Sequence, residues 1–123
     1  MPTISHFNIP ADDIERAKRF YTEVFDWKIT RDPGPMEYYM IETSTPDGEI
    51  GLGGGMAKKD DPSQAITPFI DVPSIDDCIK KIEELGGKLV SPKMAVPNTG
   101  YVAVCLDTEN NAIGLWETDE DAV

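Results

Sequence analysis

The chain has 123 residues, 40% of them hydrophobic, which suits one domain whose core needs no metal ion or disulfide to hold it together. Its 11 basic and 23 acidic residues give a formal net charge of -12. Such a surface repels nucleic-acid phosphates and anionic lipid head groups, so we expect neither nucleic-acid nor membrane binding.

The first half of the chain is predicted to fold as a strand, a helix and three further strands. Residues 4–9 alternate in character and stop at Pro10, as a short strand does. Strand-like segments at residues 27–31, 37–42 and 49–56 are separated by turn-forming residues. Between them lies an amphipathic helix that Asp12 or Asp13 caps and Asp26 ends, marked by apolar residues at spacings of three and four: Ile14, Ala17, Phe20, Tyr21, Val24 and Phe25.

The second half repeats this order after a polar connector at residues 57–64. A strand over residues 66–72 ends at Pro73, and Gly86 and Gly87 stop the helix that follows. Further strands are expected at residues 88–91, 101–106 and 112–117, the last two joined by a hairpin loop at residues 107–111. The apolar stripe of this second helix consists of Ile75, Cys78, Ile79, Ile82 and Leu85.

Residues that end strands and begin helices recur at matching positions in the two halves, which indicates an internal duplication. Ile9 and Pro10 before the first helix correspond to Val72 and Pro73 before the second, a period of about 60 residues, too long and too few in copies for a solenoid. We therefore predict a single α+β domain, residues 1–123, made of two βαβββ units over residues 4–56 and 65–118. One helix covers one face of each mixed sheet, and the other faces are expected to enclose a pocket with the helices outside.

The two cysteines, Cys78 and Cys105, lie in apolar-periodic segments, where a free thiol behaves as a small hydrophobic side chain. We therefore expect a reducing, cytoplasmic environment, and we see neither a signal peptide nor a membrane-spanning run. Cys105 is a poor candidate nucleophile, because its strand reads as buried and His6 is the only histidine that could act as its base.

Motifs spread over roughly residues 4–118 resemble one known family. They are residues 6–13 with the Arg-Ala and Phe-Tyr pairs of the first helix, residues 25–27, and in the second half residues 86–92, 100–101 and 107–117. In order and spacing they resemble the vicinal-oxygen-chelate family, which includes glyoxalases, ring-cleaving dioxygenases and bleomycin-resistance proteins, with small glyoxalase-related proteins the best match. Asp26 stands where that family usually has Gly before Trp.

The resemblance implies a divalent metal ion bound by His or Gln near the start of each unit's first strand and by Glu in its last strand. His6 matches the first of these positions. Its counterpart in the second unit is Thr67, or Phe69 in the other possible register. Neither is a good ligand for a divalent metal.

The last-strand positions are Gly53, or Gly51, and Gly114, which have no side chain. Glu117 lies on the opposite side of its strand from Gly114 and Trp116, so it cannot replace the missing ligand without a bulge. We therefore expect no metal ion and no other cofactor, with His6 the only surviving candidate ligand.

Strand alternation then selects the residues expected to line the pocket. If Ile113 and Leu115 face the helices, Gly114 and Trp116 face the pocket, and the glycines would let a ligand approach the backbone. Alternatively, residues 53–55 form an irregular strand end, and the aromatic rings belong to the core or to a dimer interface. The candidate ligand-binding residues are His6, Asn8, Tyr38 (or Tyr39), Thr67, Phe69, Tyr101 and Trp116.

Two functions stay open at this point. One is a metal-independent small-molecule binding protein, similar to the bleomycin-resistance branch. The other is a lyase, isomerase or dioxygenase-like enzyme related to lactoylglutathione lyase, in which His6 is the catalytic acid or base. A third possibility is a homodimeric interaction protein without a ligand. The resemblance implies a homodimer, and the scarcity of Lys and Arg near the expected lining favours a neutral or cationic ligand.

Overall fold

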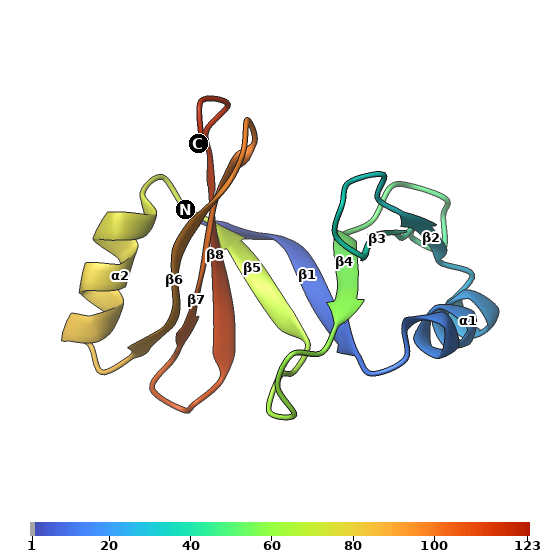
Figure 1. Ribbon diagram of the computed structural model, residues 1–123, viewed down its shortest axis with the longest axis horizontal. Coiled ribbons are helices and arrows are strands. Elements are labelled where there is room, and N and C mark those ends of the chain that lie inside the picture. Colours follow the sequence, from blue (N-terminus) through green and yellow to red (C-terminus); the bar gives the residue numbers. More distant parts are fainter. Residues whose placement is uncertain (1) are drawn as a thin grey trace. The chain divides into compact units, whose positions relative to one another are not determined.

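The computed structural model describes residues 2–123 as two compact units (Figure 1). The first-half unit contains residues 6–66, and the second-half unit contains residues 67–123 together with the start of the chain up to Ser5. Along the chain, strand, helix and three strands occur twice. The predicted α+β class with tandem βαβββ units is therefore confirmed.

The first-half unit places one helix against a four-stranded mixed sheet. Its elements are β1 (Thr3–Ala11), α1 (Ile14–Phe25), β2 (Lys28–Arg31), β3 (Tyr38–Glu42) and β4 (Gly53–Lys58). The strand order is β2-β3-β4-β1, with β4 parallel to β1 and antiparallel to β3. Side chains from α1 and one face of the sheet form the core: Ile9, Ala11, Ile14, Ile29, Tyr39, Ile41 and Met56.

Helix α1 begins and ends where the sequence predicts. The Asp13 carboxylate accepts a hydrogen bond from the backbone N–H of Arg16 at 3.1 Å and so caps the first turn. Asp26 adopts a left-handed backbone with φ 59°, and its N–H donates to the Thr22 carbonyl oxygen. This conformation favours glycine and is tolerated by aspartate, so Asp26 does the work of a helix-terminating Gly.

The second-half unit has the same plan. Its elements are β5 (Thr67–Asp71), α2 (Ile75–Glu84), β6 (Lys88–Val96), β7 (Gly100–Leu106) and β8 (Ala112–Thr118). The order is β5-β8-β7-β6, with β5 parallel to β8. Ser74 caps α2 by accepting a hydrogen bond from the N–H of Asp77 at 3.2 Å. The buried core lies between α2 and the sheet: Val72, Ile75, Ala103, Cys105 and Leu115.

Three strands differ from the predicted bounds by more than one residue at an end. β1 continues through Pro10, and β6 continues past Pro92 to Val96 with two register shifts against β7. Proline lacks an N–H donor but has extended geometry, so a strand can continue where no neighbour needs that donor or where a bulge absorbs it. β4 begins only at Gly53, because residues 45–48 form a turn closed by the isolated bridge between Ser44 and Ile50.

The start of the chain belongs with the second half. The Ser5 hydroxyl donates to the Phe69 carbonyl oxygen at 3.4 Å, so β1 contributes its first residues to one unit and the remainder to the other. The prediction that residues 1–123 form one domain stays a prediction. Within residues 2–123, neither helix has the length and apolar character needed to cross a bilayer.

Candidate functional site

Alternate residues of β1 divide between the two faces of the first-half sheet. Phe7 and Ile9 pack in the core on the α1 side. His6 and Asn8 therefore lie on the opposite face, as predicted, and both are partly buried. Across the parallel pairing with β4, His6 is opposite Gly53 and Asn8 is opposite Gly55.

The structure brings Asn8 and Tyr38 together. The Tyr38 hydroxyl donates a hydrogen bond to Asn8 Oδ1 at 3.4 Å, and its ring lies over Gly55, where a Cβ atom would collide with it. Burial raises the pKa of the Tyr38 hydroxyl, and the negative charge of Asp32 raises it further. The phenol is therefore protonated at neutral pH and acts as a donor.

The Tyr39 side chain lies on the opposite face of β3 from that of Tyr38. Its side chain packs in the core of the first-half unit, and its hydroxyl donates to Glu15 Oε1 at 3.2 Å. Of the two tyrosines between which the sequence could not choose, Tyr38 is the one on the face that carries His6 and Asn8.

Gly53 is open on this face, which distinguishes it from its neighbours. A Cβ atom added at Gly53 would meet only the Ile41 carbonyl oxygen, at an ordinary 3.6 Å, whereas at Gly51 it would lie 2.6 Å from Thr43 Oγ1. Packing therefore does not require glycine at position 53, and bare backbone lies next to His6. Residues 53–55 pair regularly with β1, so the irregular-strand interpretation is wrong.

The second-half sheet presents a corresponding face. Phe69 and Gly114 are opposite each other on β5 and β8, and the Phe69 ring occupies the space that a Cβ atom at Gly114 would need. Thr67 shares this face with Phe69 by alternation, and Trp116 shares it with Gly114. The Trp116 indole N–H donates to Thr118 Oγ1 at 3.0 Å. Gly55 and Gly114 are thus covered by rings, contrary to the expectation that a ligand could approach the backbone at Gly114.

Tyr101 does not join this face. It pairs with Glu117 on β8 and packs against the core on the α2 side, with Lys93 Nζ 4.4 Å from the centroid of its ring. The predicted grouping of Tyr101 with Trp116 is therefore wrong. Alternation within β7 is visible in the sequence, but the phase of β7 relative to β8 depends on the pairing across their hairpin.

Glu117 also lies on the α2 side. Its Oε1 atom accepts the backbone N–H of Ile75 at 2.8 Å and so stabilises the first turn of α2. Among residues 2–123, no group of three or more His, Cys, Asp or Glu side chains is placed to hold a metal ion. The residues at the family's usual ligand positions do not fit a metal ion. His6 is paired with Gly53 and Phe69 with Gly114, so His6 is the only one of these four residues whose side chain can bind a metal ion.

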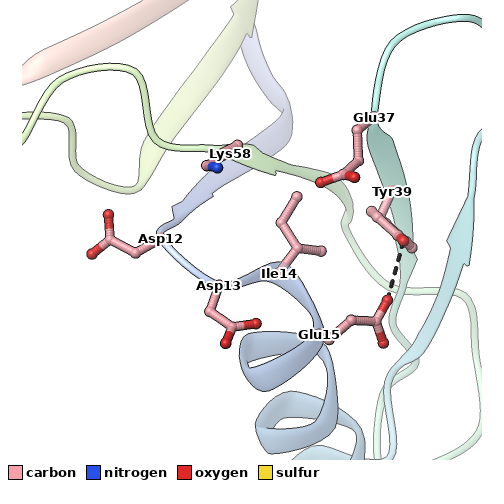
Figure 2. A pocket seen from close by; sticks show the side chains of 7 residues that line it. All are labelled: Asp12, Asp13, Ile14, Glu15, Glu37, Tyr39 and Lys58. Carbon is pink, nitrogen blue, oxygen red and sulfur yellow. Dashed lines mark hydrogen bonds between the residues drawn. The ribbon is translucent and has the colours of Figure 1, made fainter.

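A separate hollow of about 290 Å³ lies at the start of α1 (Figure 2). Sequence reasoning missed it, although the acidic residues before and within the first turn of α1 were a visible signal. Two of its polar side chains have structural roles, since Asp13 caps α1 and Glu15 accepts the Tyr39 hydroxyl. Of the predicted site residues only Tyr39, the alternative to Tyr38, is part of its lining, which consists of Asp12, Asp13, Ile14, Glu15, Glu37, Tyr39 and Lys58.

Comparison with known proteins identifies the family. A family model described as the N-terminal region of bleomycin-resistance-like proteins matches residues 3–44. A glyoxylase-like domain-containing protein of Didymella fabae is 30% identical over 112 residues, which cover 88% of each chain. The chain belongs to the glyoxalase-like family. This confirms the resemblance to the vicinal-oxygen-chelate superfamily.

Solved structures agree with this assignment. A glyoxalase I variant from Zea mays is 25% identical, with a TM-score of 0.65, over 92% of the present chain and 42% of its own. A member of the glyoxalase/bleomycin resistance protein/dioxygenase superfamily from Vibrio splendidus is 12% identical, with a TM-score of 0.64, over 93% and 97% of the two chains. The Zea mays chain is more than twice as long as the part of it that is matched. The Vibrio splendidus protein, at 12% identity, shows the fold alone.

Proposed function

We propose that this glyoxalase-like protein binds a small molecule without a metal ion, and that His6, Asn8 and Tyr38 contact the ligand. The observation that carries the proposal is the open backbone at Gly53 directly beside His6. Where the enzymes of the family need a metal-binding carboxylate, this chain offers a surface that a ligand can approach closely.

The chemistry of this face favours a neutral, partly apolar ligand. The His6 imidazole and the Asn8 amide both donate and accept hydrogen bonds, and the Tyr38 phenol donates. Met40, on the same face of β3, leaves 54% of its surface exposed beside these polar groups. An apolar surface with a few polar groups is the usual composition of a small-molecule site.

Metal analysis tests the first half of the proposal. We expect protein purified without chelators, and then equilibrated with Zn²⁺, Ni²⁺, Fe²⁺ or Mn²⁺ and desalted, to retain far less than one metal ion per chain. Elemental analysis measures this directly. One tightly held ion per chain would contradict the metal-independent proposal, and loss of that ion in His6→Ala would place it at His6.

Ligand binding tests the second half. A thermal-shift screen of neutral aromatic and amphipathic compounds should give hits whose affinity falls about tenfold or more in Gly53→Val, since its side chain covers the bare backbone, a loss of about 1.4 kcal/mol. His6→Ala should weaken the same hits by a smaller factor. Lys80→Ala, on the exposed side of α2, is the control. Equal affinities in all variants would rule out this face as the binding site.

A second candidate is an enzyme related to lactoylglutathione lyase. The 25% identity to glyoxalase I of Zea mays favours it, and an imidazole such as that of His6 is a common catalytic acid or base. Turnover of a screened compound that disappears in His6→Ala, while binding is retained, would favour this candidate over simple binding.

A further inference from the structure

The side-chain amide of Asn8 is held in one orientation by a tyrosine from another strand. The Tyr38 hydroxyl donates to Asn8 Oδ1 at 3.4 Å. An amide has an acceptor oxygen at one end and a nitrogen with two N–H donors at the other. A phenol that donates to the oxygen therefore leaves the nitrogen for another partner. Tyr38 thus decides which end of the Asn8 amide meets a ligand.

Tyr38 reaches Asn8 by crossing the strand that lies between them. The strand order is β3-β4-β1, so β3 and β1 are roughly 9–10 Å apart, two strand spacings. Tyr38 is paired with Ala57, but its ring lies over Gly55, which is the residue paired with Asn8. A Cβ atom at position 55 would collide with the ring and its hydroxyl. Gly55 is therefore a positioning residue that gives the phenol its path to the amide.

The phenol keeps the proton that it donates. Burial raises the pKa of the Tyr38 hydroxyl, and the negative charge of Asp32 raises it further. The hydroxyl is therefore protonated at neutral pH, and the nearby carbonyl oxygen of the Asn8 side chain accepts this proton in the hydrogen bond. The orientation of the amide is maintained over the whole neutral range.

The Asn8 Nδ2 group is available to a ligand. Within residues 2–123, the bond from Tyr38 is the one hydrogen bond that the Asn8 side chain makes. In the same part of the chain, no side-chain nitrogen or oxygen is enclosed without a partner, so solvent reaches Nδ2. Met40, which is 54% exposed, and the open backbone of Gly53 lie on the same face. A donor beside apolar surface is thus presented in a fixed direction.

We propose that Asn8 Nδ2 selects ligands that carry a carbonyl-type acceptor oxygen, and that Tyr38 and Gly55 impose this preference by fixing the amide. The inference rests on the proposed function, because it specifies the ligand chemistry of the same face. An acceptor oxygen gains a hydrogen bond from Nδ2, whereas an N–H group placed there meets another donor and both stay unpaired. A neutral ketone, lactone or amide with an apolar body fits this face.

Three fused bicyclic compounds of similar size test the preference. Indanone carries an acceptor only, indole carries one N–H donor, and indane carries neither group. NMR titration of nitrogen-15-labelled protein measures their affinities, and the amide signals that shift also locate the bound compound. In the unmodified chain, indanone should bind about tenfold more tightly than indole or indane, because it alone gains a hydrogen bond without leaving a donor unpaired.

Asn8→Asp should reverse the preference. Its carboxylate still accepts the Tyr38 hydroxyl but has no N–H to offer, so indole should bind about tenfold more tightly than indanone where the carboxyl group is ionised. Asn98→Asp makes the same change at an exposed residue of the second-half unit and should leave the preference for indanone intact. The ratio of the two affinities is the readout, because a general loss of stability would weaken both compounds alike.

Two further variants test the positioning residues. Tyr38→Phe removes the hydroxyl, and Gly55→Ala displaces the ring, so in each variant the Asn8 amide is free to turn either end towards the ligand. The affinities of indanone and indole should then agree within about twofold. Circular dichroism checks that each variant is folded, and Tyr38→Phe adds no atom that strains the sheet.

The outcomes separate this inference from the proposed function. Absence of binding at millimolar concentration, or binding that shifts signals elsewhere and is unaffected by Gly53→Val, would contradict the proposed function and this inference with it. Binding that Gly53→Val weakens, but with indole equal to or tighter than indanone, would overturn the acceptor preference alone. Persistence of the preference for indanone in Asn8→Asp would overturn it as well.

Discussion

Replacing Gly114 with Ala should lower the free energy of unfolding by about 2–3 kcal/mol, although only one methyl group is added. The new Cβ atom would collide with the ring of Phe69, which is itself only 5% exposed. The ring cannot move away without displacing its own neighbours. Urea denaturation, monitored by tryptophan fluorescence, measures the loss.

Gly53→Ala is the matched control. It makes the same change on the corresponding strand, but the nearest atom to its Cβ is the Ile41 carbonyl oxygen at 3.6 Å. We expect an effect within about 0.5 kcal/mol. Phe69→Leu should recover part of the stability lost in Gly114→Ala, because a smaller side chain leaves room for the methyl group. Equal losses for Gly53→Ala and Gly114→Ala would contradict this account of the two glycines.

Truncating the core residue Leu115 to Ala should cost about 2–5 kcal/mol, and so should Met56→Ala. Leu115 is 1% exposed in the core of the second-half unit, and Met56 is fully buried in the core of the first-half unit. Each substitution removes buried apolar surface and leaves a cavity. Thermal and urea unfolding measure both losses.

The same pair of variants tests the predicted single domain. If residues 1–123 unfold as one cooperative domain, the unmodified chain shows one transition, and both variants shift it. If the two compact units unfold independently, two transitions appear and each variant shifts only one of them. That second outcome would contradict the prediction of a single domain.

The order of elements could be predicted because its signals are local. Apolar residues at spacings of three and four marked both helices, and Asp26 marked the end of α1 correctly. The sequence offered Asp12 or Asp13 as the cap of α1, and the structure selects Asp13. The duplication could be inferred from the matching strand-ending residues of the two halves alone. Apart from the late start of β4, the larger errors in strand bounds lay at prolines inside β1 and β6, where the sequence does not show whether a neighbouring strand needs the missing donor.

The candidate site was predictable only in part, for a related reason. Alternation along β1 correctly placed His6 and Asn8 opposite the core. It failed for Tyr101, because the phase of one strand relative to the next depends on pairing across a turn. The sequence also could not distinguish Tyr38 from Tyr39, since adjacent residues of a strand are equally plausible on either face until its packing is known.

The glycines show most clearly which properties the sequence determines by itself and which only the folded structure decides. Composition and periodicity specify the α+β class, the duplication and the absence of carboxylates at Gly53 and Gly114, since each of these depends on residue identity or on near neighbours. Residue identity does not reveal that Gly55 and Gly114 lie under the rings of Tyr38 and Phe69 while Gly53 is open. That difference arises from side chains brought together by pairing between strands, and such contacts exist only once the chain has folded.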